Sequence, residues 1–311
     1  MRVIDSHVHF PAPAGKIIDD GTTGSEARPS EAADGPAPRL DPWLQREKEK
    51  WARAWRFPEE QKVSTDQGIA RWNAEADKYA YLQKIVFVTA GSNAFAADLV
   101  RMRPDKFAAY AHHDPLLADA VERLERAVSV QGLKGYKVLG PKVERRLDDR
   151  SLFPLWETVQ DLGIPLLVHF GTMGGAGGIA SHVNINPLVI HDVAKAFPRL
   201  PIIIPHFGCG YLFETLNLCW VCPNVCIDSS GSNQWMRWMP YELNLETLFR
   251  KYRETIGAER ILFGTDSSWF PRGFATAYLD EQVRAMVYVG YSESEVDAVL
   301  YGNAARLLRL A

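Results

Sequence analysis

Two histidines near the amino terminus, His7 and His9, are the first residues whose type and spacing could do chemistry. They lie in an apolar strand pattern at residues 1–10, and residues two apart on a strand point to the same face. Two imidazoles on one face can bind one metal ion. Asp5 would share that face, where it could orient a ligand or be a buried, hydrogen-bonded acid. A lone His-x-His pair also fits surface or core histidines, so the other ligands must come from later in the chain.

The elements that would position these side chains follow a regular rhythm from Lys84 onward, in which short apolar runs alternate with stretches of helical period. After the first strand, the pattern predicts strands at residues 84–89, 107–112, 133–139, 165–170, 202–206, 225–228 and 261–265. It predicts helices at 92–103, 116–130, 151–162, 186–197, 210–221 and 245–257, and two or three more after 275. Eight strands alternating with helices predict an α/β fold of the TIM, or (β/α)8, barrel type. An open doubly wound sheet normally has a glycine-rich turn after its first strand, where this chain has His-Val-His-Phe-Pro.

A long segment separates the first strand from this rhythm. Residues 11–42 are rich in Pro, Gly, Ala, Asp and Ser and predict an irregular loop, and helical patterns follow near 43–57 and 65–82. We therefore predict one barrel domain over residues 1–311, with an insertion at 11–80 that is a natural lid. Its tryptophans, Trp43, Trp51 and Trp55, are expected to pack, because aromatic residues at helical spacing usually do so.

Composition favours a small-molecule partner. The 35 basic and 38 acidic residues give a net charge of −3, which offers no surface for nucleic acid or an anionic membrane. No run approaches about 18 apolar residues, and no targeting segment is evident, so we expect a cytoplasmic protein. A homo-oligomer is the base-rate expectation for such a barrel.

The four cysteines, all between residues 209 and 226, predict reduced thiols and not a disulfide framework. A zinc site is not expected there, because Cys219 falls at a helix end and Cys226 inside a strand.

A parallel barrel brings the carboxyl ends of its strands to one rim, where the active sites of barrel enzymes lie. The first strand ends at His7 and His9, the fifth at His169, the sixth at His206 and the eighth at Asp266. Five residues of metal-ligand type on one rim predict a metal site.

The motifs that contain these residues resemble the amidohydrolase superfamily, and within it the amidohydrolase-2 branch that includes aminocarboxymuconate-semialdehyde decarboxylase-like enzymes. The resemblance spans nearly the whole chain and rests on residues 5–9, 135–137, 167–169, 204–210 and 262–267. It implies that His7, His9, His169 and Asp266 bind one divalent ion, with Zn²⁺ expected first and Mn²⁺ second, and that His206 acts as acid or base beside it. Such a ligand set leaves an open position, where the ion lowers the pKa of water toward about 7.

Lys137 keeps a second ion under consideration. Its position resembles that of the bridging carboxylated lysine in binuclear members of the superfamily, and in a binuclear site His206 would become a ligand. The amidohydrolase-2 branch is usually mononuclear, and a lysine at a strand end commonly binds substrate or pairs with an acid. We therefore expect one ion, with Lys137 near the substrate.

Four more side chains are candidates for substrate contacts. Arg272 offers a forked donor for a carboxylate, or a surface ion pair, and Trp269 offers an aromatic wall or a packing contact. His112 ends the third predicted strand, and His182 follows the glycine-rich run at 171–178. For His112 a turn or hydrogen-bonding role fits equally well.

Two reactions fit this rim. The first expectation is hydrolysis of a lactone or amide, in which activated water attacks the carbonyl, His206 stabilises the developing charge and Asp266 passes a proton to the leaving group. The alternative is nonoxidative decarboxylation of an aromatic or dienoic acid, with Asp266 or His206 protonating the carbon. A decarboxylase needs a cation for the carboxylate and an aromatic slot. A third hypothesis is a catalytically inactive barrel. It predicts that at least one metal-ligand position holds a residue that cannot bind a metal, and every such position here holds His or Asp.

Overall fold

The structure is a computed structural model, which describes residues 1–10, 41–54, 58, 60–61, 63–89 and 91–310. The strands are β1 (Val3–Phe10), β2 (Leu82–Thr89), β3 (Phe107–Ala109), β4 (Ala111–His112), β5 (Tyr136–Leu139), β6 (Leu166–His169), β7 (Ile202–Ile204), β8 (Val225–Asp228) and β9 (Ile261–Leu262). The helices are α1 (Pro42–Ala54), α2 (Thr65–Lys78), α3 (Asn93–Met102), α4 (Ala120–Ser129), α5 (Phe153–Leu162), α6 (His191–Ala196), α7 (Leu212–Val221), α8 (Leu245–Ile256), α9 (Thr276–Tyr288), α10 (Glu293–Asp297) and α11 (Asn303–Leu307).

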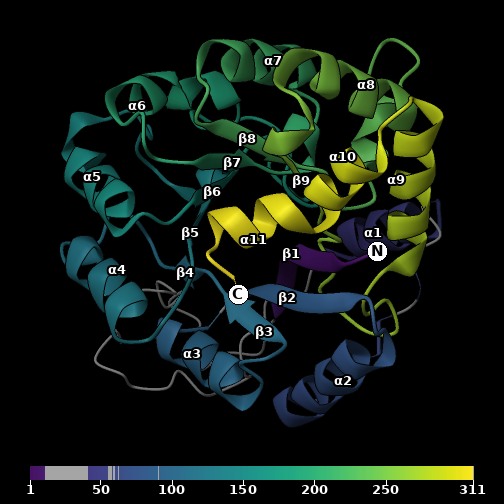
Figure 1. Cartoon of the computed structure of the whole chain (residues 1–311), viewed down its shortest axis with the longest axis horizontal. Coiled ribbons are helices and arrows are strands. Elements are labelled where there is room, and N and C mark those ends of the chain that lie inside the picture. Colours follow the sequence, from purple (N-terminus) through teal and green to yellow (C-terminus); the bar gives the residue numbers. More distant parts are fainter. Residues whose placement is uncertain (11–40, 55–57, 59, 62, 90, 311) are drawn as a thin grey trace.

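All strand pairs are parallel and follow the chain order, β1 to β3 in one ladder and β4 to β9 in the other. The ring closes where Val8 of β1 pairs with Ser267, just after β9. Helices α2 to α9 surround the strands (Figure 1). The chain is therefore a TIM barrel, as the sequence predicts.

The prediction of one uninterrupted strand at 107–112 is wrong. β3 pairs with β2 and ends at Ala109, whereas β4 begins at Ala111 and pairs with β5. At the break, Tyr110 donates its N–H to the carbonyl of Phe87, and Ala111 donates to that of Gly135. The segment thus changes its partner strand at Tyr110, which a pattern of apolar residues does not reveal.

The strands predicted at 202–206 and 261–265 each end more than one residue earlier than expected, and a candidate catalytic residue follows each of them in the next turn. β7 stops at Ile204, because Pro205 has no N–H for a ladder and His206 has a left-handed backbone with φ of 57°. β9 stops at Leu262, and Asp266 has φ of 52°. His206 and Asp266 therefore lie in turns that leave the strands, where their side chains can face the rim.

The barrel interior is filled by apolar residues from strands around the whole ring, among them Ile4, Val86, Leu167, Ile203 and Leu262. α11 packs on this cluster through Ala304 and Leu307 and lies across one mouth of the barrel (Figure 1). This seals the end at which the strands begin, so the opposite rim is the one open to a substrate.

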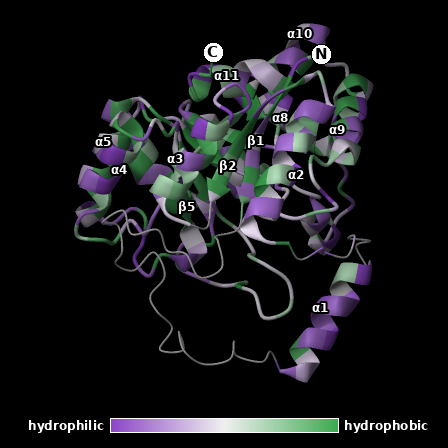
Figure 2. Cartoon of the chain, turned by 90° about the horizontal axis from the view of Figure 1, so that it is seen from below, coloured by the Kyte–Doolittle hydropathy of each residue, from purple (hydrophilic) through white to green (hydrophobic). Residues whose placement is uncertain are grey.

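Part of the predicted insertion at 11–80 lies outside the described residues, namely 11–40, 55–57, 59 and 62. Its helix α1 stands apart from the barrel (Figure 2), and Leu44 lies close to Gly177 of the loop after β6. The role of this segment as a lid stays a prediction. In the described part of the chain, no helix is both long enough and apolar enough to cross a membrane.

Candidate metal centre and cavity

The side chains at the ends of β1 and β9 converge on one point. His7 Nε2 lies 3.2 Å from His9 Nε2. Asp266 Oδ1 lies 3.2 Å from His9 Nε2 and 3.8 Å from His7 Nε2. Ligand atoms around a tetrahedral ion with bonds of roughly 2.1 Å are about 3.4 Å apart, so these three atoms have the spacing of ligands to one ion.

His169 and His206 complete the group on the same rim. Their rings lie 5.2 Å apart, and the His206 ring lies 5.4 Å from that of His7. Among the described residues, His169 Nε2 is buried without a hydrogen-bond partner, which costs roughly 1–3 kcal/mol unless a ligand compensates. His7, His206 and Asp266 also bring ligand atoms within 4.8 Å of one another. These donors fit a divalent ion.

The protonation states favour metal binding. Burial, and then the charge of Lys137, lowers the pKa of His7 to about 4, and burial also lowers the pKa of His169 well below its usual value. Both rings are therefore neutral at pH 7 and have a lone pair for an ion. Burial alone would raise the pKa of Asp266, but His206 and His9 outweigh it and hold that pKa well below its usual range.

Behind these ligand candidates lies a buried network that the sequence analysis did not single out. Asp228 accepts a hydrogen bond of 3.0 Å from His7 Nδ1, and Ser230 Oγ lies between the rings of His7 and His206. Burial would raise the pKa of Asp228, but its contacts with His7 outweigh this and the pKa is lowered. Asp228 ends β8, so collecting every carboxylate at a strand end would have found it.

Asp5 is a buried, hydrogen-bonded acid, which is one of the two roles that the sequence left open for it. Its carboxylate accepts hydrogen bonds from the backbone N–H and the hydroxyl of Thr265, at 2.8 and 2.6 Å. The β1–β2 register is irregular between Asp5 and Val8, so the simple alternation that put Asp5 beside the histidines does not hold. Burial raises the pKa of Asp5 to about 7.

Lys137 is fully buried, and its Nζ lies 3.3 Å from His7 Nε2. Burial lowers the pKa of this lysine to about 8. His112 Nδ1 donates a hydrogen bond to the Lys137 carbonyl at 2.9 Å. Lys137 thus lies at the candidate metal centre, but its predicted roles toward a second ion or a substrate stay predictions.

A cavity of about 390 Å³ opens from the metal centre. Its floor contains His9, His169, His206 and Asp266, and its walls come from the loops after β6, β8 and β9. The aromatic and cationic wall residues are Trp235, Trp238, Trp269 and Arg272.

Arg272 is oriented toward this cavity by three contacts. Its Nη2 donates to the carbonyl of Thr265 at 3.0 Å, and its guanidinium lies 4.8 Å from the ring of Trp269 and 5.0 Å from that of Tyr278. The cation therefore has a defined position in the cavity wall.

Two predicted substrate contacts, His112 and His182, are not among the residues that line this cavity. His182 Nδ1 instead accepts the N–H of Asn184 at 3.2 Å. Trp43 is 57% exposed and does not line the cavity either, whereas Trp55 and the side chain of Trp51 lie outside the described part.

Trp235 and Trp238 were missed by the sequence analysis. They belong to a short 3₁₀ helix, Gln234–Trp238, in the loop after β8. This loop carries no strand or helix periodicity, and only the pair of tryptophans three residues apart could have drawn attention to it.

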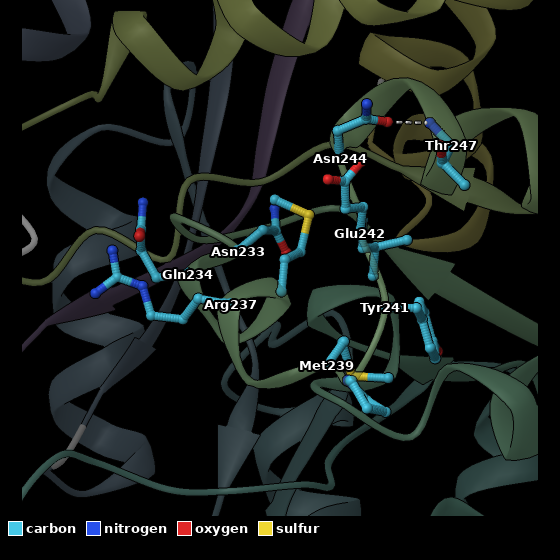
Figure 3. Close-up of a pocket in the computed structure, with 11 residues that line it drawn as sticks. Asn233, Gln234, Arg237, Met239, Tyr241, Glu242, Asn244 and Thr247 are labelled. Carbon is cyan, nitrogen blue, oxygen red and sulfur yellow. Dashed lines mark hydrogen bonds between the residues drawn. The ribbon is translucent and has the colours of Figure 1, made fainter.

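The other face of the same loop forms a wide surface groove of about 900 Å³, lined by residues of the segment 233–247 (Figure 3). Asn233 and Gln234 line both the groove and the cavity. The 3₁₀ helix therefore forms a thin partition between the cavity and the surface.

The four cysteines are all buried and free of disulfide bonds. Arg260 donates hydrogen bonds to the carbonyls of Cys219 and Cys222, which fixes the end of α7. Cys209 lines the cavity, and burial raises the pKa of its thiol to about 12.

Comparison with known proteins agrees with this architecture. The amidohydrolase family model matches residues 4–310. The chain is 24% identical to a gamma-resorcylate decarboxylase of Polaromonas sp. (strain JS666 / ATCC BAA-500) over an alignment of 256 residues, which covers 70% of this chain and 75% of that protein.

Two solved structures show the same fold over nearly their whole length. One is a dihydroxybenzoic acid decarboxylase from Polaromonas sp. JS666 with bound manganese and the inhibitor 2-nitroresorcinol, with a TM-score of 0.61 and 18% identity, covering 99% of this chain and 97% of that one. The other is a probable 2-pyrone-4,6-dicarboxylic acid hydrolase from Acinetobacter baumannii with citric acid bound, with a TM-score of 0.61 and 13% identity, covering 100% of both chains. At these identities the likeness shows the fold alone.

Proposed function

Because this chain belongs to the amidohydrolase family, we propose that it is a metal-dependent enzyme that decarboxylates an aromatic acid without an oxidant. The observation that carries this proposal is the cavity wall, where Arg272 and three tryptophans face a floor of ligand-type side chains. A cation for a carboxylate and an aromatic slot are what a decarboxylase needs beyond the metal centre. We therefore prefer decarboxylation to the hydrolysis that the sequence alone put first.

The relatives support the same choice. One relative is a gamma-resorcylate decarboxylase, whose name gives an aromatic acid as its substrate. One structural neighbour contains manganese, so Mn²⁺ is the first ion to test and Zn²⁺, the first expectation from the sequence, is the second.

In this proposal His7, His9, His169 and Asp266 hold the ion, which polarises a substrate oxygen when bound. Their spacing and the unpartnered Nε2 of His169 support this ligand set. Arg272 binds an anionic group of the substrate, and the ring packs against Trp235, Trp238 and Trp269.

His206 supplies the proton. Its Nδ1 donates to the carbonyl of Ser230 at 3.0 Å, which leaves Nε2 for the cavity. The protonated ring transfers a proton to the carbon that bears the carboxyl group. The bond to that carboxyl group then breaks, its electrons restore the aromatic ring and carbon dioxide leaves. His206 regains its proton from solvent.

The test is an assay of protein loaded with Mn²⁺ or Zn²⁺ against 2,6-dihydroxybenzoate, other hydroxybenzoates and a panel of lactones and amides. Carbon dioxide and the decarboxylated ring formed in equal amounts would support the proposal. Acid release without gas would favour hydrolysis of the kind named for the pyrone dicarboxylate neighbour. Carbon dioxide formation that persists after the metal is removed would contradict the metal-dependent mechanism.

A further inference from the structure

We propose that Asp228 is a positioning residue that fixes Nδ1 as the protonated nitrogen of His7 and, through Ser230, of His206. Each ring then presents Nε2 to the metal centre and the cavity. This inference rests on the metal centre of the proposed function, but it concerns residues behind the ligands and not the reaction itself.

The first half of the argument concerns one oxygen of Asp228. Its Oδ2 lies 3.0 Å from His7 Nδ1, and both side chains are at most 1% exposed, so water does not compete for this contact. An ionised carboxylate can only accept hydrogen bonds, so His7 must donate from Nδ1. The lone pair of His7 is then on Nε2, the atom that lies 3.2 Å from His9 Nε2.

The second half concerns the other oxygen and Ser230. Asp228 Oδ1 accepts the hydroxyl of Ser230 at 2.5 Å. A hydroxyl has one hydrogen, so Ser230 Oγ can only accept from its remaining neighbours. One of these is His206 Nδ1, at 2.9 Å. The carbonyl of Ser230, 3.0 Å from the same nitrogen, is a second acceptor. His206 is therefore also protonated at Nδ1.

The same carboxylate also fixes the backbone beside His206. Asp228 Oδ1 accepts the N–H of His206 at 3.1 Å and that of Ser230 at 2.9 Å. His206 has a φ of 57°, a conformation that non-glycine residues adopt rarely and only when the surroundings enforce it. One buried side chain thus determines which ring nitrogen of His7 and of His206 carries the proton, and it also fixes the backbone conformation of His206.

The sharpest test is Asp228→Asn, which keeps the shape of the side chain. The amide oxygen would take the place of Oδ1, because the three groups there, the N–H of His206 and the N–H and hydroxyl of Ser230, are all donors. The amide NH₂ would then face His7 Nδ1 and force its proton onto Nε2, the atom needed for the ion. Removing an outer partner of a metal-binding histidine typically weakens metal affinity about 10- to 100-fold.

Asp5→Asn is the matched control. Asp5 is as buried as Asp228 and lies on β1 near the same rim, but its carboxylate bonds to Thr265 and to the backbone of His7 and not to the ring of that histidine. The wild type and both variants would be compared as full chains by competition of Zn²⁺ against a chelator and by thermal unfolding. In the metal-free proteins, imidazole ¹⁵N chemical shifts report which ring nitrogen carries the proton.

In the wild type, we expect both His7 and His206 to carry the ring proton on Nδ1. In Asp228→Asn, we expect the proton of His7 on Nε2 and about 10- to 100-fold weaker Zn²⁺ binding. Asp5→Asn should show neither change. Unchanged Zn²⁺ affinity or an unchanged His7 form in folded Asp228→Asn would overturn the inference. If that variant does not fold, the wild-type spectrum decides, because a neutral ring of either histidine that carries its proton on Nε2 alone contradicts the inference. Inactivity toward every aromatic acid would refute the proposed reaction and leave these measurements unaffected.

Discussion

The floor and the wall of the cavity are built in different ways. The floor rests on strand ends, where His7, Asp228 and Ser230 are at most 1% exposed and hydrogen-bonded to one another. Much of the wall comes from the loop after β8, where Trp238 is 50% exposed and a groove lies on the other face. The floor is therefore determined by the barrel itself, whereas the wall depends on a loop that can vary without disturbing the strands.

This difference assigns separate tasks to the two regions. The floor provides the metal ligands and the proton, which every substrate of the reaction requires. The wall provides a cation and aromatic surface, which decide the substrates that fit. Changes in the floor should abolish turnover for every substrate, and changes in the wall should alter the preference among substrates.

The largest effect is expected from His7→Ala combined with His9→Ala. These rings contribute two of the ligand atoms that lie 3.2 Å apart, so the variant should lose its bound metal. Loss of an ion that contributes several kcal/mol to the transition state should lower kcat/KM by at least about 10³-fold. The measurement is metal content by elemental analysis together with the rate of carbon dioxide release.

The matched control for that double variant is His191→Ala. This histidine lies at the start of α6, its side chain is 43% exposed, and its ring is hydrogen-bonded to the neighbouring Asp192. The metal content and activity of the His191→Ala variant should equal those of the wild type. Full metal content in the double variant would refute the metal centre at the end of β1.

The second largest effect is expected from His206→Gln. Loss of a general acid typically lowers kcat by about 10²- to 10⁴-fold, measured as the rate of carbon dioxide release. Metal content should remain, because His7, His9, His169 and Asp266 are unchanged. If the ion is lost together with the activity, His206 is a ligand, which its grouping with His7 and Asp266 within 4.8 Å would then explain.

Much of the floor could be predicted from the sequence, because strands impose a periodicity that can be seen in the chain. The apolar runs that precede His169 and His206 locate their strands, and the barrel fold then brings the strand ends together. The positive φ of His206 and Asp266 could not be predicted, because neither is glycine. The alternation rule also misplaced Asp5, since the register of β1 is irregular.

The wall was harder to predict for a physical reason. Trp235 and Trp238 lie in a loop whose conformation depends on contacts such as the 3.2 Å hydrogen bond from Trp235 Nε1 to Asn233 Oδ1. Such contacts leave no periodic trace in the sequence. Arg272 and Trp269 were found only because they follow Asp266 directly.

The third prediction concerns the wall cation. Arg272→Met removes a donor to an anionic substrate, and hydrogen bonds to charged groups contribute about 1.5–3 kcal/mol, so KM should rise roughly 10- to 100-fold while kcat changes less. Arg272→Lys is the companion variant, because it keeps the charge but loses the forked geometry, and it should recover part of the affinity. Equal KM values in wild type and Arg272→Met would show that the carboxylate binds elsewhere.

The smallest effect is expected from Trp238→Ala, at the most exposed part of the aromatic wall. An aromatic pair contributes about 0.5–1.5 kcal/mol beyond burial, so KM should rise roughly 2- to 10-fold, and metal content and thermal stability should hardly change. Trp220→Ala is the matched control, because Trp220 is 71% exposed on α7 and does not line the cavity. KM values for a series of ring-substituted hydroxybenzoates would check this. If Trp238→Ala changes the order of preference among these hydroxybenzoates and Trp220→Ala does not, the wall determines substrate choice. If Trp238→Ala instead lowers kcat equally for every substrate, the proposed division of tasks between floor and wall is wrong.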